Sequence, residues 1–218
     1  MPIVTQNAAG RARDRTATEA RILRAARTVF ARRGYDAAGL REIAEVAQAN
    51  LSLISRYFGG KEGLLVALTD QFVAARREGA LPYPPQPNLE AEIHAYLRAK
   101  LAQDLADEEV IRLIVSRSAI DADFRRSGAR HMDGKADRNF HDRIRLLQDR
   151  GAVPPDADID LLFASVQYMS FSVNFFGAML ADRPMAEAEA LFAGFAAALA
   201  DGLPRGGRPP PGTGGLEA

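Results

Sequence analysis

The sequence predicts an all-α fold, and three observations support that prediction. Alanine is abundant, whereas the strand-forming residues valine, isoleucine and threonine are sparse. Apolar residues recur at helical spacing, and no stretch alternates between strand and helix patterns. The chain has 218 residues, 47% of them apolar, which is enough for one large domain or two small ones with a buried core.

The composition excludes several classes of site. The chain contains no cysteine, so disulfides, thiolate zinc sites, iron–sulfur clusters and cysteine nucleophiles are ruled out. Its first 15 residues lack the apolar core of a signal peptide, and its most apolar stretch, 161–180, carries five polar side chains. We therefore expect a soluble, cytoplasmic protein with no membrane partner.

Charge is distributed unevenly along the chain. Residues 1–79 carry 13 Lys and Arg against 8 Asp and Glu, whereas residues 80–218 carry 15 against 20. A basic first third favours a polyanionic partner for that part of the protein. Ordinary scatter of charge is the alternative explanation, and the imbalance alone does not exclude it.

The first part of the chain predicts a basic arm and then a helix. Residues 1–14 are expected to form a flexible arm, and the capping box Thr16-x-x-Glu19 predicts a helix start. Gly34, preceded by two arginines, predicts its end. Three arginines could enter a minor groove, although a solvated tail is the favoured interpretation: Arg11, Arg13 and Arg15.

Two short helices and a longer one follow. Residues 40–47 predict the second helix, and Asn50 is expected to cap a third that continues to Tyr57. The pair Gly59-Gly60 interrupts the pattern, and Lys61 begins a fourth helix that extends to about Arg77. The proline-rich stretch 79–88 cannot continue a helix and predicts a domain boundary.

The remaining two-thirds predicts a second helical domain over 88–203, after a first domain over 15–78. The tail, 204–218, has the composition of a disordered end. The expected helices cover about 89–104, 107–119, a long segment within 121–150, 159–180 and 184–201.

Two short helices joined by a tight break are the arrangement of a helix-turn-helix. In that arrangement the second short helix reads base edges in the major groove. Leu53, Ile54 and Phe58 can face inward, which leaves an outward face able to contact bases: Asn50, Leu51, Ser52, Ser55 and Arg56. Tyr57 and Lys61 are placed to contact phosphates. An ordinary pair of solvated surface helices is the alternative.

Residues 16–67 resemble the N-terminal domain of the tetracycline-repressor (TetR) family. The first helix ends on Ala26-x-x-x-Phe30-x-x-x-Gly34-Tyr35, the second contains "REIA", and the fourth opens on Lys61-Glu62 after Tyr57-Phe58. The resemblance implies DNA contacts at eight positions: Arg41, Asn50, Leu51, Ser52, Ser55, Arg56, Tyr57 and Lys61.

The segment also departs from the family pattern at three places. Gln48 stands where a turn glycine is usual, and Ala38-Gly39 replaces the usual serine or threonine cap of the second helix. Ser55-Arg56 replaces the usual tyrosine pair. These differences bear on the DNA sequence that is read, and Gln48 can adopt a left-handed turn only at some cost.

The last two helices are expected to form a homodimer interface. Segment 159–180 is apolar nearly all round, so one face must be buried on something other than its own core. Segment 184–201 is rich in alanine, which permits close helix approach. In the resembling family these helices of two subunits form a four-helix bundle, and the domain holds a ligand. A monomer with a thicker core is the alternative.

Four residues are candidates for contact with a small apolar or aromatic effector: Tyr168, Met169, Asn174 and Phe175. Polar groups within an apolar helix need partners, and a ligand can be one. Each is also explained as an ordinary core residue whose polar group is satisfied by the protein.

No metal or cofactor is expected. Asp133, Asp137 and His141 share one helix face at spacings of four and could hold a divalent ion, but neighbouring arginines favour a solvated, salt-bridged face. No phosphate-binding glycine loop or nucleophile elbow indicates an enzyme. The sequence therefore predicts a ligand-responsive, sequence-specific regulator that acts as a repressor and homodimer on a near-palindromic operator in double-stranded DNA. The alternatives are a helical ligand-binding or protein-interaction protein that has lost DNA binding and, more weakly, a helical enzyme.

Overall fold

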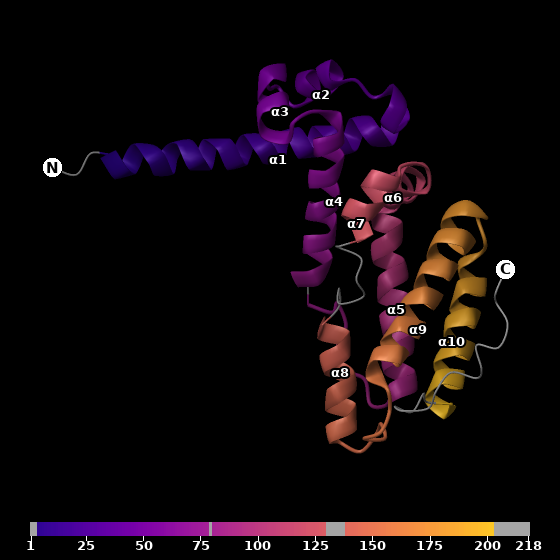
Figure 1. Ribbon diagram of the computed structural model, residues 1–218. Helices are drawn as coiled ribbons and strands as arrows, with labels where there is room; N and C mark the ends of the chain where they lie inside the picture. The colour runs from indigo at the N-terminus through magenta and orange to yellow at the C-terminus, as the bar shows by residue number, and fades with distance from the viewer. Residues whose placement is uncertain (1–3, 79, 130–137, 203–218) are drawn as a thin grey trace. The chain divides into compact units, whose positions relative to one another are not determined.

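The structure is a computed structural model that describes residues 4–78, 80–129 and 138–202. Within those residues every regular element is a helix, which confirms the predicted fold class. The chain forms two compact units: residues 1–78 with 107–136, and residues 79–106 with 137–218 (Figure 1).

The first unit begins with a long helix, α1 (Val4–Ala37), whose N-terminal half projects beyond the helices packed on its C-terminal half (Figure 1). The predicted helix start at Thr16 is wrong, because α1 already begins at Val4 and includes the described part of the arm. That segment is rich in alanine and arginine and lacks proline, so it continues the helix readily. An ion pair between Arg15 Nε and Glu19 Oε1, 2.7 Å long, bridges one turn there.

Three further helices of the first unit match the predicted order: α2 (Leu40–Val46), α3 (Leu51–Phe58) and α4 (Lys61–Glu78). α2 and α4 contact α1, and α3 contacts both α2 and α4. Their apolar faces enclose one core, whose fully buried members include Ile22, Phe30, Ile43, Ile54, Leu64 and Leu65.

Two helices expected in the second domain pack on this unit instead: α6 (Glu108–Ile120) and α7 (Ala122–Ala129). Val110, Leu113, Ile114 and Phe124 complete the core around α1 and α4. Asp107 also accepts a 2.9 Å hydrogen bond from Arg27 Nη2. The proline-rich stretch marks a change of unit, but the chain returns to the first unit at residue 107.

The second unit contains α5 (Leu89–Ala106), α8 (Arg138–Asp149), α9 (Ile159–Phe171), η1 (Ser172–Leu180) and α10 (Met185–Asp201). α5 contacts the other four elements of this unit. The tight core includes Ile93, Tyr96, Leu97, Phe140, Ile144, Leu162, Val166 and Phe192. The single long helix expected within 121–150 is represented by α7 and α8, and residues 130–137 between them lie outside the described residues.

Segment 159–180 changes from an α-helix to a π-helix at Ser172. The wider turn is visible at its end, where Ala181 N–H donates to Phe176 O at 3.2 Å, five residues back. Val173, Asn174 and Phe175 are consecutive and all buried, which the spacing of an ordinary surface helix does not permit. The π-helix therefore turns a polar side chain, Asn174, toward the core.

The continuous stretch Ile159–Leu180 is long and apolar enough to cross a membrane by length and composition, with a mean hydropathy of 1.2. This is weak evidence for a membrane span, because core helices pass the same test. Here the stretch supplies Leu162, Phe163 and Val166 to the core of the second unit.

Candidate nucleic-acid interface

The turn between α2 and α3 is closed by two backbone hydrogen bonds. Gln48 N–H donates to Glu45 O at 3.0 Å, and Ala49 N–H donates to Ala44 O at 2.9 Å. This pattern requires a left-handed residue after the helix, and Gln48 has φ 50°. Gln48 thus adopts the conformation that a glycine usually supplies, and the family departure at this position leaves the turn intact.

Asn50 caps α3, as predicted from the sequence. Its Oδ1 accepts hydrogen bonds from the Ser52 N–H and from the Ser52 hydroxyl, both at 2.8 Å. The Nδ2 group of Asn50 remains available as a donor, because only the acceptor end is used by the cap. Ile54 is fully buried beneath α3, while Leu53 and Phe58 are partly buried against the same core.

The opposite face of α3 is exposed and polar. Asn50, Ser52, Ser55 and Arg56 are exposed there, together with Leu51 at its start. Arg41, near the start of α2, is exposed as well. Among the described residues, neither Arg41 nor Arg56 has a side-chain hydrogen bond or ion pair. Two guanidinium groups without a hydrogen-bond or ion-pair partner among the residues that the structure describes are therefore available to another molecule.

The junction between α3 and α4 depends on three glycines. Gly59 and Gly60 have φ of 75° and 131°, conformations that residues with a side chain rarely adopt. Gly63 has ordinary helical geometry, but an added Cβ there would overlap the carbonyl oxygen of Phe58 and lie 2.8 Å from its carbonyl carbon. α4 thus packs directly on the backbone end of α3. Sequence reasoning missed Gly63, since nothing in its local pattern shows this contact.

Lys61 lies in the first turn of α4, but its ammonium group already has contacts within the protein. Its Nζ donates to the backbone oxygen of Asp36 at 2.9 Å and lies 4.7 Å from the ring centroid of Tyr35. Burial raises the pKa of Tyr35, and the nearby Arg117 opposes that change. Lys61 therefore ties the start of α4 to the end of α1 and keeps further N–H donors.

Tyr57 is partly buried at the end of α3. The guanidinium of Arg15 lies 5.0 Å from its ring centroid, and Phe58 meets it edge-on with centroids 6.4 Å apart. No hydrogen bond joins its hydroxyl to the side chains that the structure describes. The ring is held by the protein and the hydroxyl is left to bond elsewhere.

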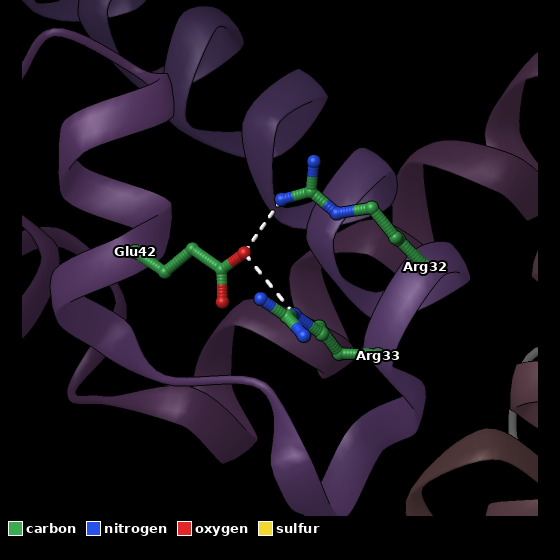
Figure 2. Close-up of polar contacts among 3 residues, drawn as sticks. All are labelled: Arg32, Arg33 and Glu42. Carbon is green, nitrogen blue, oxygen red and sulfur yellow. Dashed lines mark hydrogen bonds and ion pairs between the residues drawn. The ribbon is translucent and has the colours of Figure 1, made fainter.

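Two arginines at the end of α1 share one acceptor on α2 (Figure 2). Glu42 Oε1 accepts from Arg32 Nη2 at 2.5 Å and from Arg33 Nε at 3.4 Å. Desolvation raises the pKa of Glu42, but the hydrogen bonds and charges of the two arginines outweigh it and hold that pKa below its usual value. This pair of contacts fixes α2, and Arg41 with it, against α1.

An exposed apolar face runs along α9, η1 and α10 in the second unit. Tyr168 is 77% exposed and Phe176 57%. The other large members are Leu161, Phe171, Leu180, Met185 and Leu191. Phe171 stacks on buried Phe175 with ring centroids 5.3 Å apart, so this face continues into the core. Five large apolar side chains of segment 159–180 are exposed in the protomer, as expected for a segment that is apolar nearly all round.

The four effector candidates do not come together. Tyr168 belongs to the exposed apolar face, and Met169 is partly buried against the core. Asn174 is 1% exposed, and its Nδ2 donates to Asp104 Oδ2 at 2.6 Å and to Ser170 Oγ at 3.2 Å. No described group donates a hydrogen bond to its buried Oδ1. Asn174 and Phe175 are thus the buried members of the set.

The metal candidates are only partly placed. Asp133 and Asp137 lie outside the described residues, and His141 Nε2 lies 2.9 Å from Asp160 Oδ1. Within the part of the chain that the structure describes, no group of three or more acidic or histidine side chains could hold a metal ion.

Comparison with known proteins gives a consistent result. Residues 22–68 match the family model described as bacterial regulatory proteins, tetR family. An HTH-type transcriptional repressor from Streptomyces coelicolor, SCO4008, is 29% identical over 168 residues, which cover 74% of this chain and 81% of the relative. These matches support DNA-binding transcriptional regulation, and the relatives are regulators and not enzymes.

Solved structures share the fold. A putative TetR-family transcriptional regulator from Mesorhizobium loti covers 86% of this chain and 97% of its own, with a TM-score of 0.64 and 19% identity. GusR from Salmonella enterica covers 84% and 95%, with a TM-score of 0.64 and 16% identity. At these identities the likeness concerns the fold alone.

Proposed function

We propose that this chain, whose residues 22–68 match the family model of tetR regulatory proteins, is a TetR-family regulator that represses transcription as a homodimer bound to a near-palindromic operator. In this proposal α3 of each protomer lies in the major groove of double-stranded DNA. An effector bound in the second unit changes the affinity of the dimer for that operator. The protein acts in the cytoplasm and carries out no reaction.

The observation that carries the proposal is the outward face of α3. Ser52, Ser55 and Arg56 are exposed on a helix whose other face is fixed in the core by Ile54. Arginine can donate two hydrogen bonds to guanine, and the hydroxyls and the Asn50 amide can donate or accept at other base edges. Leu51 offers an apolar contact for a thymine methyl group. Tyr57, Lys61 and Arg41 contact the backbone or neighbouring bases, which sets the register of the helix.

The exposed apolar face of the second unit supports the homodimer. Tyr168, Phe171 and Phe176 are large apolar side chains that are exposed to water in a single protomer. Exposed Leu191, Gly194 and Ala198 lie at helical spacing on α10, where small residues permit close approach. A two-fold axis through α9, η1 and α10 buries this face against the same face of a second copy. The dimer then has two helix-turn-helix units for a symmetric site.

The buried polar group at Asn174 supports an effector site beside Phe175. A buried acceptor without a hydrogen-bond partner destabilises the protein by about 1–3 kcal/mol. An apolar or aromatic molecule that donates one hydrogen bond to Asn174 Oδ1 would remove that cost on binding. Binding there shifts the dimer between states only if the effector prefers one of them. The expected outcome is release of the operator, since the relative is named a repressor.

The proposal is tested by selecting bound duplexes from random DNA with the full-length protein and then titrating salt on the best sequence. We expect a near-palindromic site and an affinity that falls steeply with salt, because Lys and Arg displace counterions from phosphates. The Arg56→Ala variant provides the control for base reading. If no sequence is enriched and affinity does not depend on salt, the protein is a helical ligand-binding or interaction protein without DNA binding.

A further inference from the structure

An arginine outside the helix-turn-helix packs on the same tyrosine ring as the lysine that the proposed function places on DNA. Arg117, in the last turn of α6, lies with its guanidinium carbon 4.6 Å from the ring centroid of Tyr35. The same ring has the Lys61 ammonium 4.7 Å from its centroid. Arg117 is far from Lys61 in sequence and lies beyond the residues that match the family model.

The ring of Tyr35 is held in place by three neighbours. Phe30 packs on it with centroids 5.5 Å apart, and the two cations lie against it. Arg117 is itself fixed, because it also pairs with Asp121, which caps α7 by accepting from the Asp123 and Phe124 N–H groups. A continuous series of contacts therefore leads from the start of α7 to the ammonium group of Lys61.

A flexible lysine benefits from such support. Ordering a lysine side chain costs rotamer entropy, and that cost is avoided on binding if the side chain is already ordered. The Asp36 oxygen and the Tyr35 ring order the Lys61 ammonium before DNA arrives. It keeps free N–H groups for a phosphate, so preorganisation and binding are compatible.

We propose that Arg117 is a positioning residue for DNA binding: through the Tyr35 ring it holds the Lys61 ammonium where a phosphate oxygen of the duplex can reach it. The inference rests on the proposed function, since it assigns a support to one of its phosphate contacts. It also makes the affinity for DNA depend on α6, an element outside the motif that reads DNA.

A double-mutant cycle on the operator from the selection experiment tests this. The variants are Arg117→Met, Lys61→Met and the double variant, with Arg112→Met as a matched control. Arg112 lies on the same helix and carries the same charge, but it pairs with Glu108 and is 43% exposed. Each variant is measured for affinity to operator and random duplex, for salt slope, and for folding by urea denaturation.

Lys61→Met is expected to lower the affinity for both duplexes about 3- to 10-fold. It should also reduce the slope of log affinity against log salt by about 0.9, the value for one phosphate contact. Arg117→Met should also lower the affinity for both duplexes. The double variant should bind both no more weakly than Lys61→Met alone. Arg112→Met should bind like the wild type. Arg117→Lys, which keeps a cation near the ring, should recover part of the loss and replaces Arg117→Met if that variant does not fold.

Three results would overturn the inference. Losses that multiply in the double variant mean that Arg117 binds DNA independently. An Arg117→Met protein that binds like the wild type means that the ring needs no support. Equal losses in Arg112→Met and Arg117→Met mean that only overall charge matters. A wild-type protein that binds no duplex refutes the proposed function itself, which separates the two failures.

Discussion

Gly63→Ala should destabilise the first unit and displace the recognition helix. In a helix interior this exchange alone gains up to about 1 kcal/mol, because glycine loses more backbone entropy on folding. Here the added Cβ would overlap the Phe58 carbonyl oxygen and lie 2.8 Å from its carbonyl carbon. Backbone atoms cannot rotate away, and overpacking of this kind costs about 1–3 kcal/mol and occasionally more. The overlap therefore outweighs the propensity gain, and we expect a net loss of about 1–2 kcal/mol.

The assay is urea denaturation followed by helical signal, combined with operator binding of the folded protein. Gly39→Ala is the matched control, because Gly39 has φ −100° and an added Cβ there meets no atom within 4 Å. Its unfolding free energy should fall by less than about 1 kcal/mol, because Gly39 is the N-cap of α2 and alanine is a poorer cap than glycine. The folded Gly63→Ala protein should also bind operator more weakly, since relief of the overlap moves α3 relative to α4. A Gly63→Ala protein as stable as the wild type, with unchanged affinity, would refute the reasoning.

Four further outcomes follow from the described contacts. Arg56→Ala should cost about 1–3 kcal/mol of operator affinity and relax base choice at one position, measured by repeating the selection. Phe176→Asp should shift sedimentation from dimer to monomer, and an unchanged dimer would place the interface elsewhere. Glu42 has a lowered pKa, so its stabilising contacts are present above pH 4.5 and disappear as pH falls through the folded-state pKa; Glu42→Gln should flatten that acid dependence in thermal melts. Gln48→Gly should raise the unfolding free energy by up to about 1 kcal/mol, since left-handed backbone favours glycine.

Much of the helix-turn-helix could be predicted from local sequence. The Asn50 cap, the break at Gly59 and the inward side of α3 all follow from residues within one or two turns of each other. Such features depend on short-range hydrogen bonds and on helical periodicity, which a sequence displays directly. For the same reason the left-handed turn at Gln48 could be predicted from the sequence, and Gln48 has φ 50°.

Features that depend on distant contacts could not be predicted. α6 packs on the first unit because Arg27 donates a hydrogen bond to Asp107 and the apolar side of α6 is buried in the core around α1. Nothing near residue 107 reveals that choice. The capping box at Thr16 was misleading for a related reason, because a favourable helix start is also compatible with a helix that continues through it. The π-helix likewise could not be predicted, because it depends on the burial of Val173, Asn174 and Phe175 against the rest of the second unit.

The contrast between Ser55 and Gly63 explains why the reading face can be located without knowledge of the sequence that it reads. Ser55 is exposed, so replacing it should hardly change the free energy of unfolding. In the proposal, the residue at this position is therefore determined by the DNA that it contacts. Gly63 touches no base in the proposal, yet it admits no side chain, because the backbone of Phe58 occupies that space. A substitution at Ser55 can change base preference while the position of α3 stays the same. A substitution at Gly63 can affect base preference only by moving α3.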